Sequence, residues 1–159
     1  DDWREDAARR DFTMNALYMA FNGEVSDYTG GIADAQEGHV RFIGDADARI
    51  KEDYLRILRF FRFFAAYGKP PADEAALLAC AKNAAGIERL SGERIQHEMF
   101  KLLASTHPYV ALRLMDKASV LAEIFDGKKP DTLRFEKLQL AEDNLDERAD
   151  VETRLALLM

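Results

Sequence analysis

A stretch rich in arginine and aromatic residues, Glu52–Phe63, constrains the fold of this chain more than any other part of its sequence. At about 100° per residue, a helix here separates its side chains into two sets. One set falls within an arc of about 120° and predicts a buried face: Tyr54, Ile57, Leu58, Phe61, Phe64 and Ala65. The other set steps by three residues and predicts a slanting charged ridge: Asp53, Arg56, Arg59 and Arg62. The pattern predicts one helix over 46–67, stopped by Gly68 and the prolines that follow it.

The charged ridge contains one acid, three arginines and no lysine, with Phe60 and Phe63 between the arginines. A solvated helix face more often alternates lysine and glutamate. Arginine is a planar, permanently charged donor that suits phosphates, carboxylates and base edges. The same spacing also suits arginines that form structural ion pairs with acids on neighbouring helices. The spacing alone leaves both interpretations open.

The charge of the chain limits its function. The formal net charge is −7, which argues against a protein coated in nucleic-acid-binding charge and leaves room for a local basic groove. Such a groove is indicated at 54–72, where there are four basic residues and no acid. The sequence has no apolar run of transmembrane length, and its lone cysteine, Cys80, stands among alanines as a small buried residue would. We expect a cytoplasmic protein with no membrane partner.

The predicted fold class is mainly α with a small β remnant. Strand-forming residues at 16–21 and 24–28 flank Asn22-Gly23, a strong hairpin signal, and an alternating segment at 39–43 predicts one more strand. This is too little sheet to stand alone, so we expect the C-terminal strands of a larger sheet. The remaining pattern predicts helices over 46–67, 72–84, 92–104, 109–117, 120–125, 131–145 and from about 150.

Five motifs follow one another along the chain: RRDFTMNAL at 9–17, DYTGGIAD at 27–34, VRFIGD at 40–45, EDYLRILR at 52–59 and ERIQHE at 93–98. In order and spacing they resemble the motifs of class II tRNA nucleotidyltransferases, the CCA-adding enzymes, and of the related bacterial poly(A) polymerases. Ala35 departs from that pattern, which has leucine at this position. The resemblance covers about 4–105, and an ordered set of motifs is far more specific than any single one.

The resemblance implies template-free nucleotidyl transfer from CTP and ATP to the 3′ end of a tRNA or another RNA. It implies that Asp53 and Arg56 read the base edge, where an acid accepts from an exocyclic amine and an arginine donates to a ring nitrogen or carbonyl oxygen. CTP and ATP present an amine where UTP and GTP present a carbonyl, so such a pair can select the first two. The resemblance also implies that Arg10, Arg59 and Arg62 contact the incoming nucleotide.

The catalytic metal site of that family has no counterpart in this sequence. The resemblance implies two Mg²⁺ ions held by a DxD pair near a GGxxRD segment, and nothing in the chain matches them. We therefore assign no catalytic or metal-binding residue and expect this chain alone to transfer no nucleotide. We read it as a piece of a longer enzyme: the C-terminal part of the head at 1–45, a nucleotide-reading neck at 46–105 and the start of an RNA-binding body at 106–159.

Two alternatives remain open, a piece of a bacterial poly(A) polymerase and a non-catalytic helical RNA-binding module, and the sequence does not indicate the oligomeric state. Several residues near the motifs also suit structural roles. Asn15 suits a turn as well as a nucleotide contact. We expect Asp45 and Asp47 to cap a helix. Contacts between helices are the expected role of Glu93, Arg94 and Glu98.

Overall fold

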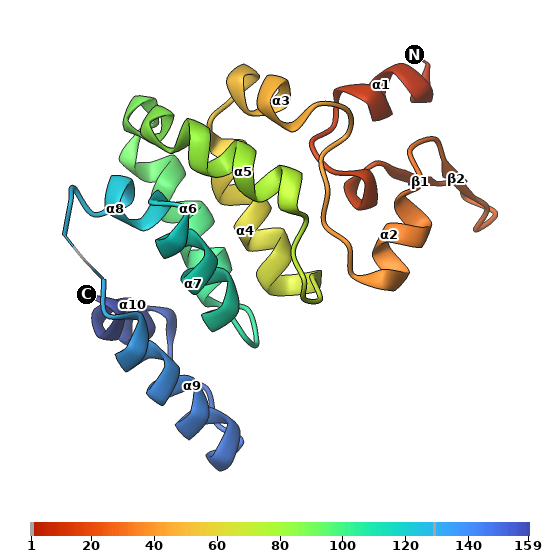
Figure 1. Cartoon of the computed structure of the whole chain (residues 1–159). Coiled ribbons are helices and arrows are strands. Elements are labelled where there is room, and N and C mark those ends of the chain that lie inside the picture. The colour runs from red at the N-terminus through yellow and green to blue at the C-terminus, as the bar shows by residue number, and fades with distance from the viewer. Residues whose placement is uncertain (1, 129) are drawn as a thin grey trace.

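The computed structural model describes residues 2–128 and 130–159 (Figure 1). The N-terminal part consists of α1 (Trp3–Arg9), the 3₁₀ helix η1 (Thr13–Asn15), the strands β1 (Leu17–Met19) and β2 (Val25–Asp27), and α2 (Gly31–Glu37). The rest of the described chain is helical: α3 (Ala46–Glu52), α4 (Leu55–Tyr67), α5 (Glu74–Asn83), η2 (Ala84–Arg89), α6 (Gly92–Leu103), α7 (Tyr109–Lys117), α8 (Val120–Ile124), α9 (Thr132–Leu145) and α10 (Val151–Leu158). The predicted fold class is confirmed.

The hairpin expected at Asn22-Gly23 is confirmed. The two strands are antiparallel, with Leu17 opposite Asp27 and Met19 opposite Val25. Gly23 has a φ of +85°, in the left-handed region that glycine adopts without strain. In Figure 1 the hairpin lies beside α2, at the end of the molecule away from the C-terminus.

The strand expected at 39–43 is wrong. Val40 and Phe42 are buried, but the segment pairs with the rest of the described chain only through an isolated bridge between Phe12 and Phe42. An extended segment sends alternate side chains to opposite sides whether or not a neighbouring strand is present. The alternation of apolar and polar residues at 39–43 therefore indicated which side chains are buried and did not indicate a strand of a sheet. The helix α2 was not expected from the sequence at all.

The single helix expected over 46–67 is also wrong, because it breaks at Asp53. This residue has extended backbone angles, φ −156° and ψ 111°, and its Oδ1 accepts a hydrogen bond of 3.0 Å from the amide of Leu55 at the start of α4. The next residue, Tyr54, packs so closely on η2 that a Cβ placed on Gly86 would lie 2.0 Å from the tyrosine ring. A side chain at residue 86 would push this junction apart.

Helix α4 lies at the centre of the fold and is buried on two sides. The expected buried face is confirmed at Ile57, Leu58, Phe61 and Phe64, while Tyr54 and Ala65 are half-buried. Phe60 and Phe63 are buried as well, against the N-terminal part of the chain: the Phe63 ring lies 5.0 Å from that of Phe12, and the Phe60 ring lies 5.9 Å from that of Phe42. These rings join the N-terminal part to the helices, so only a narrow strip of α4 carries the arginines.

Two further observations concern the whole chain. Cys80 is fully buried, as expected, and burial raises the pKa of its thiol, which makes it a poor nucleophile. Within residues 2–128 and 130–159, no helix has the length and apolar character that a membrane span needs.

Candidate functional site

The end of α1 lies against the junction of α3 and α4. The backbone oxygen of Arg10 accepts a hydrogen bond from the Arg49 guanidinium, and that of Arg9 accepts a long one, 3.4 Å, from Arg56. The side chain of Arg10 pairs with Asp6: the Nε of Arg10 donates a hydrogen bond of 3.2 Å to Oδ2 of Asp6. The structure therefore brings the backbone of Arg10 to the neck residues, while its guanidinium is paired within α1.

Asp53 stands in the break between α3 and α4 with its carboxylate fixed from two directions. Oδ1 accepts from the Leu55 amide, and Oδ2 accepts from Nη2 of Arg94 at 2.8 Å. The side chain of Asp53 remains 39% exposed. Because each carboxylate oxygen has two lone pairs, Asp53 keeps acceptor capacity toward solvent.

Arg56 lies on the first turn of α4, and its partner is not Asp53. Its Nη1 donates to Oε2 of Glu52 at 2.5 Å and to the backbone oxygen of Arg49 at 2.8 Å. The hydrogen bond from Arg56 lowers the pKa of Glu52. The expectation that Asp53 and Arg56 are neighbours on one helix is therefore corrected: the two lie on either side of a helix start, and each is oriented by its own partner.

Arg59, one turn further along α4, connects to the N-terminal part. Its Nε donates to Oδ2 of Asp11 at 2.5 Å, and Asp11 also accepts from Nδ2 of Asn15 and from the Phe12 amide, both at 3.0 Å. Burial by itself would raise the pKa of Asp11, but the hydrogen bonds from Arg59 and Asn15 outweigh it and the pKa is lowered. Asn15 thus has the structural contact that its position in a turn suggested.

Arg62 completes the strip through Glu98 of α6, whose side chain is only 4% exposed. The Nε of Arg62 lies 2.7 Å from Oε2 of Glu98, an ion pair without the alignment of a hydrogen bond, and the Nη1 of Arg59 lies 4.0 Å from Oε1. Of the three residues expected to join helices, Glu98 contacts Arg62 of α4 and Arg94 contacts Asp53 at the end of α3, and the role of Glu93 stays a prediction. Glu52 of α3, Asp11 of the segment between α1 and η1, and Glu98 of α6 therefore order the three arginines of the strip.

The strip still has donors to offer a ligand. Each guanidinium carries five N–H groups in one plane, and the side chains of Arg56, Arg59 and Arg62 are 16%, 28% and 20% exposed. The site therefore combines an oriented carboxylate at Asp53 with several oriented, partly exposed arginine donors. An acceptor beside donors complements a nucleobase edge, and the remaining cations suit phosphate.

Sequence reasoning missed three contributors to this site. Asp11 holds Arg59, Arg49 holds the backbone at Arg10, and Arg94, expected only to join helices, directly contacts the carboxylate of Asp53. The motifs gave a signal for two of them, since Asp11 belongs to RRDFT and Arg94 to ERIQHE. Periodicity could not reveal that Asp11 pairs with Arg59 or that Asp53 pairs with Arg94, because these partners are 48 and 41 residues apart.

The DYTGGIAD motif builds a tight loop. Both carboxylate oxygens of Asp27 accept hydrogen bonds from backbone amides of this loop. Oδ1 accepts from Thr29, Gly30 and Gly31, and Oδ2 accepts from Ile32. A Cβ on Gly31 would lie 2.1 Å from the backbone oxygen of Thr13, so only glycine fits there.

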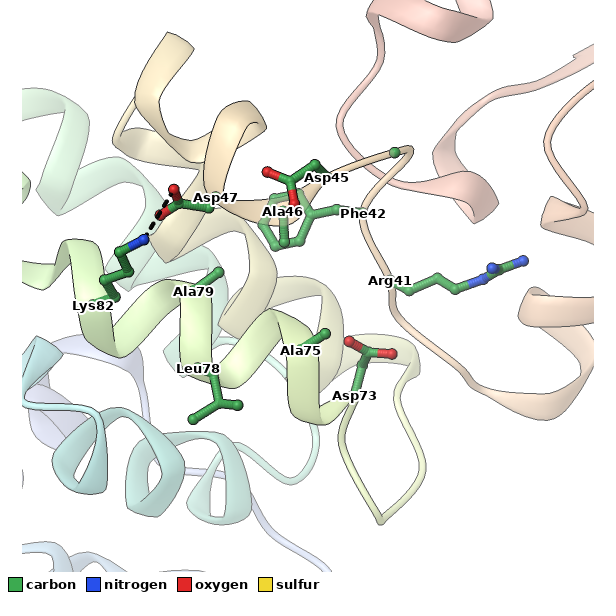
Figure 2. Close-up of a pocket in the computed structure, with 11 residues that line it drawn as sticks. Arg41, Phe42, Asp45, Ala46, Asp47, Asp73, Ala75, Leu78, Ala79 and Lys82 are labelled. Atoms are coloured by element: carbon green, nitrogen blue, oxygen red, sulfur yellow. Dashed lines mark hydrogen bonds and ion pairs between the residues drawn. The ribbon is translucent and has the colours of Figure 1, made fainter.

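A separate groove of about 470 Å³ lies between residues 41–47 and α5 (Figure 2). Its carboxylates are already engaged in structure. Asp45 caps α3 through the Ala48 amide, as expected, and Asp73 caps α5 through the Ala76 amide. The cap expected at Asp47 is wrong: this side chain instead pairs with Lys51 and Lys82, and hydrogen bonds from Lys51 and Asn83 lower its pKa. Figure 2 shows Asp47 and Lys82 facing each other, and none of the five predicted nucleotide-contacting residues lines this groove.

Comparison with known proteins finds two matching family models. The model described as the poly A polymerase head domain matches residues 1–41, and the one described as the probable RNA and SrmB-binding site of polymerase A matches residues 73–132. Neither covers 42–72, which contains Asp53, Arg56, Arg59 and Arg62.

Curated relatives are similar over about two thirds of the chain. The mouse protein "CCA tRNA nucleotidyltransferase 1, mitochondrial" is 47% identical over 108 residues, which is 67% of this chain and 25% of the relative. The "CCA-adding enzyme" of Lactiplantibacillus plantarum is 42% identical over 109 residues, 69% of this chain and 26% of the relative. The chain thus spans about a quarter of the length of these relatives.

Solved structures agree with this similarity. The crystal structure of the Bacillus stearothermophilus CCA-adding enzyme in complex with CTP aligns with a TM-score of 0.70 and 33% identity, over 75% of this chain and 30% of that one. A structure described as a tRNA-processing enzyme in an apo form aligns with a TM-score of 0.82 and 25% identity, over 99% of this chain and 46% of that one.

Proposed function

We propose that this chain, which belongs to the family of CCA-adding tRNA nucleotidyltransferases and poly(A) polymerases, supplies the nucleotide-selecting segment of an enzyme that adds CCA to tRNA 3′ ends. The observation that carries the proposal is that an oriented hydrogen-bond acceptor and an oriented hydrogen-bond donor both stand at the start of α4. Asp53 presents a carboxylate fixed by Arg94, and Arg56 presents a guanidinium fixed by Glu52.

In this proposal Asp53 accepts a hydrogen bond from the exocyclic amine of CTP or ATP, and Arg56 donates to an acceptor on the same base edge. UTP and GTP would place a carbonyl oxygen against the carboxylate, and two acceptors facing each other are disfavoured. Arg10, Arg59 and Arg62 contribute charge toward the phosphates of the nucleotide. The bound CTP of the bacterial relative supports a nucleotide of this class.

Magnesium belongs to the proposed reaction, but the described residues do not fit the ion. Within 2–128 and 130–159 there is no group of three or more His, Cys, Asp or Glu side chains that could hold a metal. The proposal therefore assigns this chain the choice of nucleotide and routes no step through the metal. It divides the chain into head (1–45), neck (46–105) and body (106–159), and a cytoplasmic location stays a prediction.

The test is Arg56→Ala in the longer enzyme that carries this segment. We expect the preference for CTP and ATP over UTP and GTP to fall by about 1–3 kcal/mol, the usual value of a specific base contact, with little change in RNA affinity. Stability should change by about 0–1 kcal/mol, because the partner Glu52 is exposed. Competition assays measure the preference, and Arg113→Ala, an exposed arginine of α7, is the matched control. An unchanged preference in Arg56→Ala would remove Arg56 from the proposal.

A second test concerns the chain by itself. Incubated with CTP, ATP, magnesium and a tRNA that lacks its CCA end, the 159-residue chain should add no nucleotide, because its described residues contain no metal-holding group. Gel analysis of labelled tRNA measures this. Clear incorporation would show that the chain carries a catalytic centre of its own.

A poly(A) polymerase remains the second candidate function, because the descriptions of both family models name that enzyme. If the longer enzyme used ATP alone, the result would favour this candidate.

A further inference from the structure

Two shallow grooves meet at Tyr67, the last residue of α4. The first has a volume of about 270 Å³ and includes Arg62, Lys101 and Ser105 in its lining. The second has a volume of about 320 Å³ and includes Lys69 and His107. Ala66 and Tyr67 line both grooves, and Tyr67 is the aromatic residue that the two grooves share.

The charged residues that line these grooves are positive, whereas the net charge of the chain is negative. The chain carries a formal net charge of −7, yet the residues that line the two grooves include Arg62, Lys69 and Lys101 and no acid. Lys101 is exposed, and the ion pairs recorded among residues 2–128 and 130–159 do not include it. His107 lies 3.7 Å from Asp143, so we do not count it as an available cation. The grooves therefore favour an anionic ligand.

The aromatic residue indicates which anion. Tyr67 is 63% exposed, and its ring lies 5.7 Å from the buried ring of Phe63. Cationic grooves interleaved with exposed aromatic rings are typical of surfaces that bind single-stranded nucleic acid, where bases stack on the rings and cations contact the phosphates.

One feature of this end of the fold opposes anion binding. Helices α4 and α6 both end here, and the carbonyl end of a helix disfavours phosphate. The buried guanidinium of Arg154 offsets this at α6, because it donates to the backbone oxygen of Leu103 and, at 2.9 Å, to that of Ser105. At α4 the amide of Gly68 donates to the backbone oxygen of Phe64. The carbonyl groups of Leu103 and Ser105 at the end of α6 and that of Phe64 in α4 thus have partners within the protein.

The first groove shares Arg62 with the proposed nucleotide site. Residues in the order of the sequence along α4 contact residues in the same order along α6. Asp53, just before α4, contacts Arg94, then Arg62 contacts Glu98, and finally Tyr67 and Lys101 line one groove. The two helices therefore run in the same direction, and Tyr67 lies about 20 Å from the start of α4 at 1.5 Å per residue. We propose that the single-stranded 3′ segment of the acceptor RNA crosses Tyr67, with one base stacked on the ring and its phosphates beside Lys101 and Arg62. This inference rests on the proposed function for the identity of the RNA.

The test uses the 159-residue chain and a fluorescently labelled single-stranded RNA that ends in CC, with anisotropy as the measurement. Tyr67→Ala should weaken binding about tenfold, and Tyr67→Phe, which keeps the ring, should bind like the unchanged chain. Lys101→Gln should weaken binding and reduce the slope of log K against log salt by about 0.7, the value for one phosphate contact on a single strand. The matched controls are Phe21→Ala, an exposed ring on the hairpin, and Lys82→Gln, an exposed lysine of α5 outside both grooves. Thermal unfolding of each variant separates lost binding from lost structure.

Equal RNA affinity in Tyr67→Ala and the unchanged chain would overturn the inference, and so would equal losses in the Tyr67 variants and the controls. Binding of CTP, ATP, UTP and GTP is measured on the same proteins. If RNA affinity depends on Tyr67 while the chain shows no preference among nucleotides, the inference stands and the proposed function fails. If the nucleotide preference is present while Tyr67 is irrelevant to RNA, the proposed function stands and this inference fails.

Discussion

Glu142 and Asp11 are both buried carboxylates that pair with an arginine, and the two arginines, Arg154 and Arg59, differ in how many of their N–H donors remain free. Arg154 donates to both carboxylate oxygens of Glu142, at 3.0 and 2.7 Å, and to the backbone oxygens of Leu103 and Ser105 at the end of α6. Its side chain is 3% exposed. Arg59 makes one hydrogen bond, from Nε to Asp11, and its Nη1 stays 4.0 Å from Glu98 with the side chain 28% exposed.

This difference separates a structural arginine from one available to a ligand. An arginine with nearly all its donors used and no contact with solvent can only hold elements together, as Arg154 holds α9 and α10 to the end of α6. An arginine oriented by one buried acid, with its other donors near solvent, can bind a ligand without first being ordered. Buried ion pairs are costly to break in both cases, so stability alone does not distinguish the two roles.

The largest expected effect comes from Arg154→Ala, which leaves Glu142 buried without a cation and two carbonyl groups without donors. We expect a loss of about 3–5 kcal/mol in the free energy of unfolding, measured by urea denaturation. Arg59→Ala is the matched variant and should lose less, because Asp11 retains the hydrogen bonds of Asn15 and the Phe12 amide. In the longer enzyme it should also weaken nucleotide binding. A larger loss of stability in Arg59→Ala than in Arg154→Ala would contradict the assignment of Arg154 as the structural arginine.

Next in size is Phe61→Ala, which tests whether the available arginines depend on the core beneath them. Phe61 is fully buried, and truncation of a core phenylalanine typically costs about 3 kcal/mol or more. We expect a lower unfolding midpoint and, in the longer enzyme, weaker discrimination between CTP and UTP, because a loosened α4 misplaces Arg56. Phe135→Ala, an equally buried ring of α9, should lower stability and leave discrimination unchanged. Unchanged discrimination in Phe61→Ala would uncouple the two properties.

The smallest effect is on the pH dependence of stability. The pKa of Asp11 is lowered in the folded protein, so the carboxylate contributes stability that is present above its unfolded pKa, about 3.9, and is lost as the pH falls through the folded value. Asp11→Asn should therefore flatten the fall in urea midpoint below about pH 4. Glu142→Gln should do the same, because burial would raise the pKa of Glu142 but the bond from Arg154 outweighs it. An Asp11→Asn profile parallel to that of the unchanged chain would contradict the assigned direction.

Local sequence signals predicted much of the helical fold. The helix over 109–117 was expected with the bounds of α7, and the hairpin turn was expected at Asn22-Gly23. Those signals failed where backbone partners decide the outcome. The segment 39–43 alternates as a strand does, but within residues 2–128 and 130–159 it pairs only through one bridge. Residue 53 continues the helical periodicity, yet its backbone is extended and its carboxylate accepts from the first amide of α4.

The sequence by itself determined the residue types of the site, because the spacing of Asp53, Arg56, Arg59 and Arg62 and the motifs around them are local properties of the chain. It also determined that one face of α4 is buried, because hydrophobic periodicity reports burial directly. Only the tertiary structure decided which acids orient Arg59 and Arg62 and which donors remain free. Glu98 and Asp11 are remote in sequence from the arginines they hold, and nothing in local spacing measures a contact between side chains 36 or 48 residues apart.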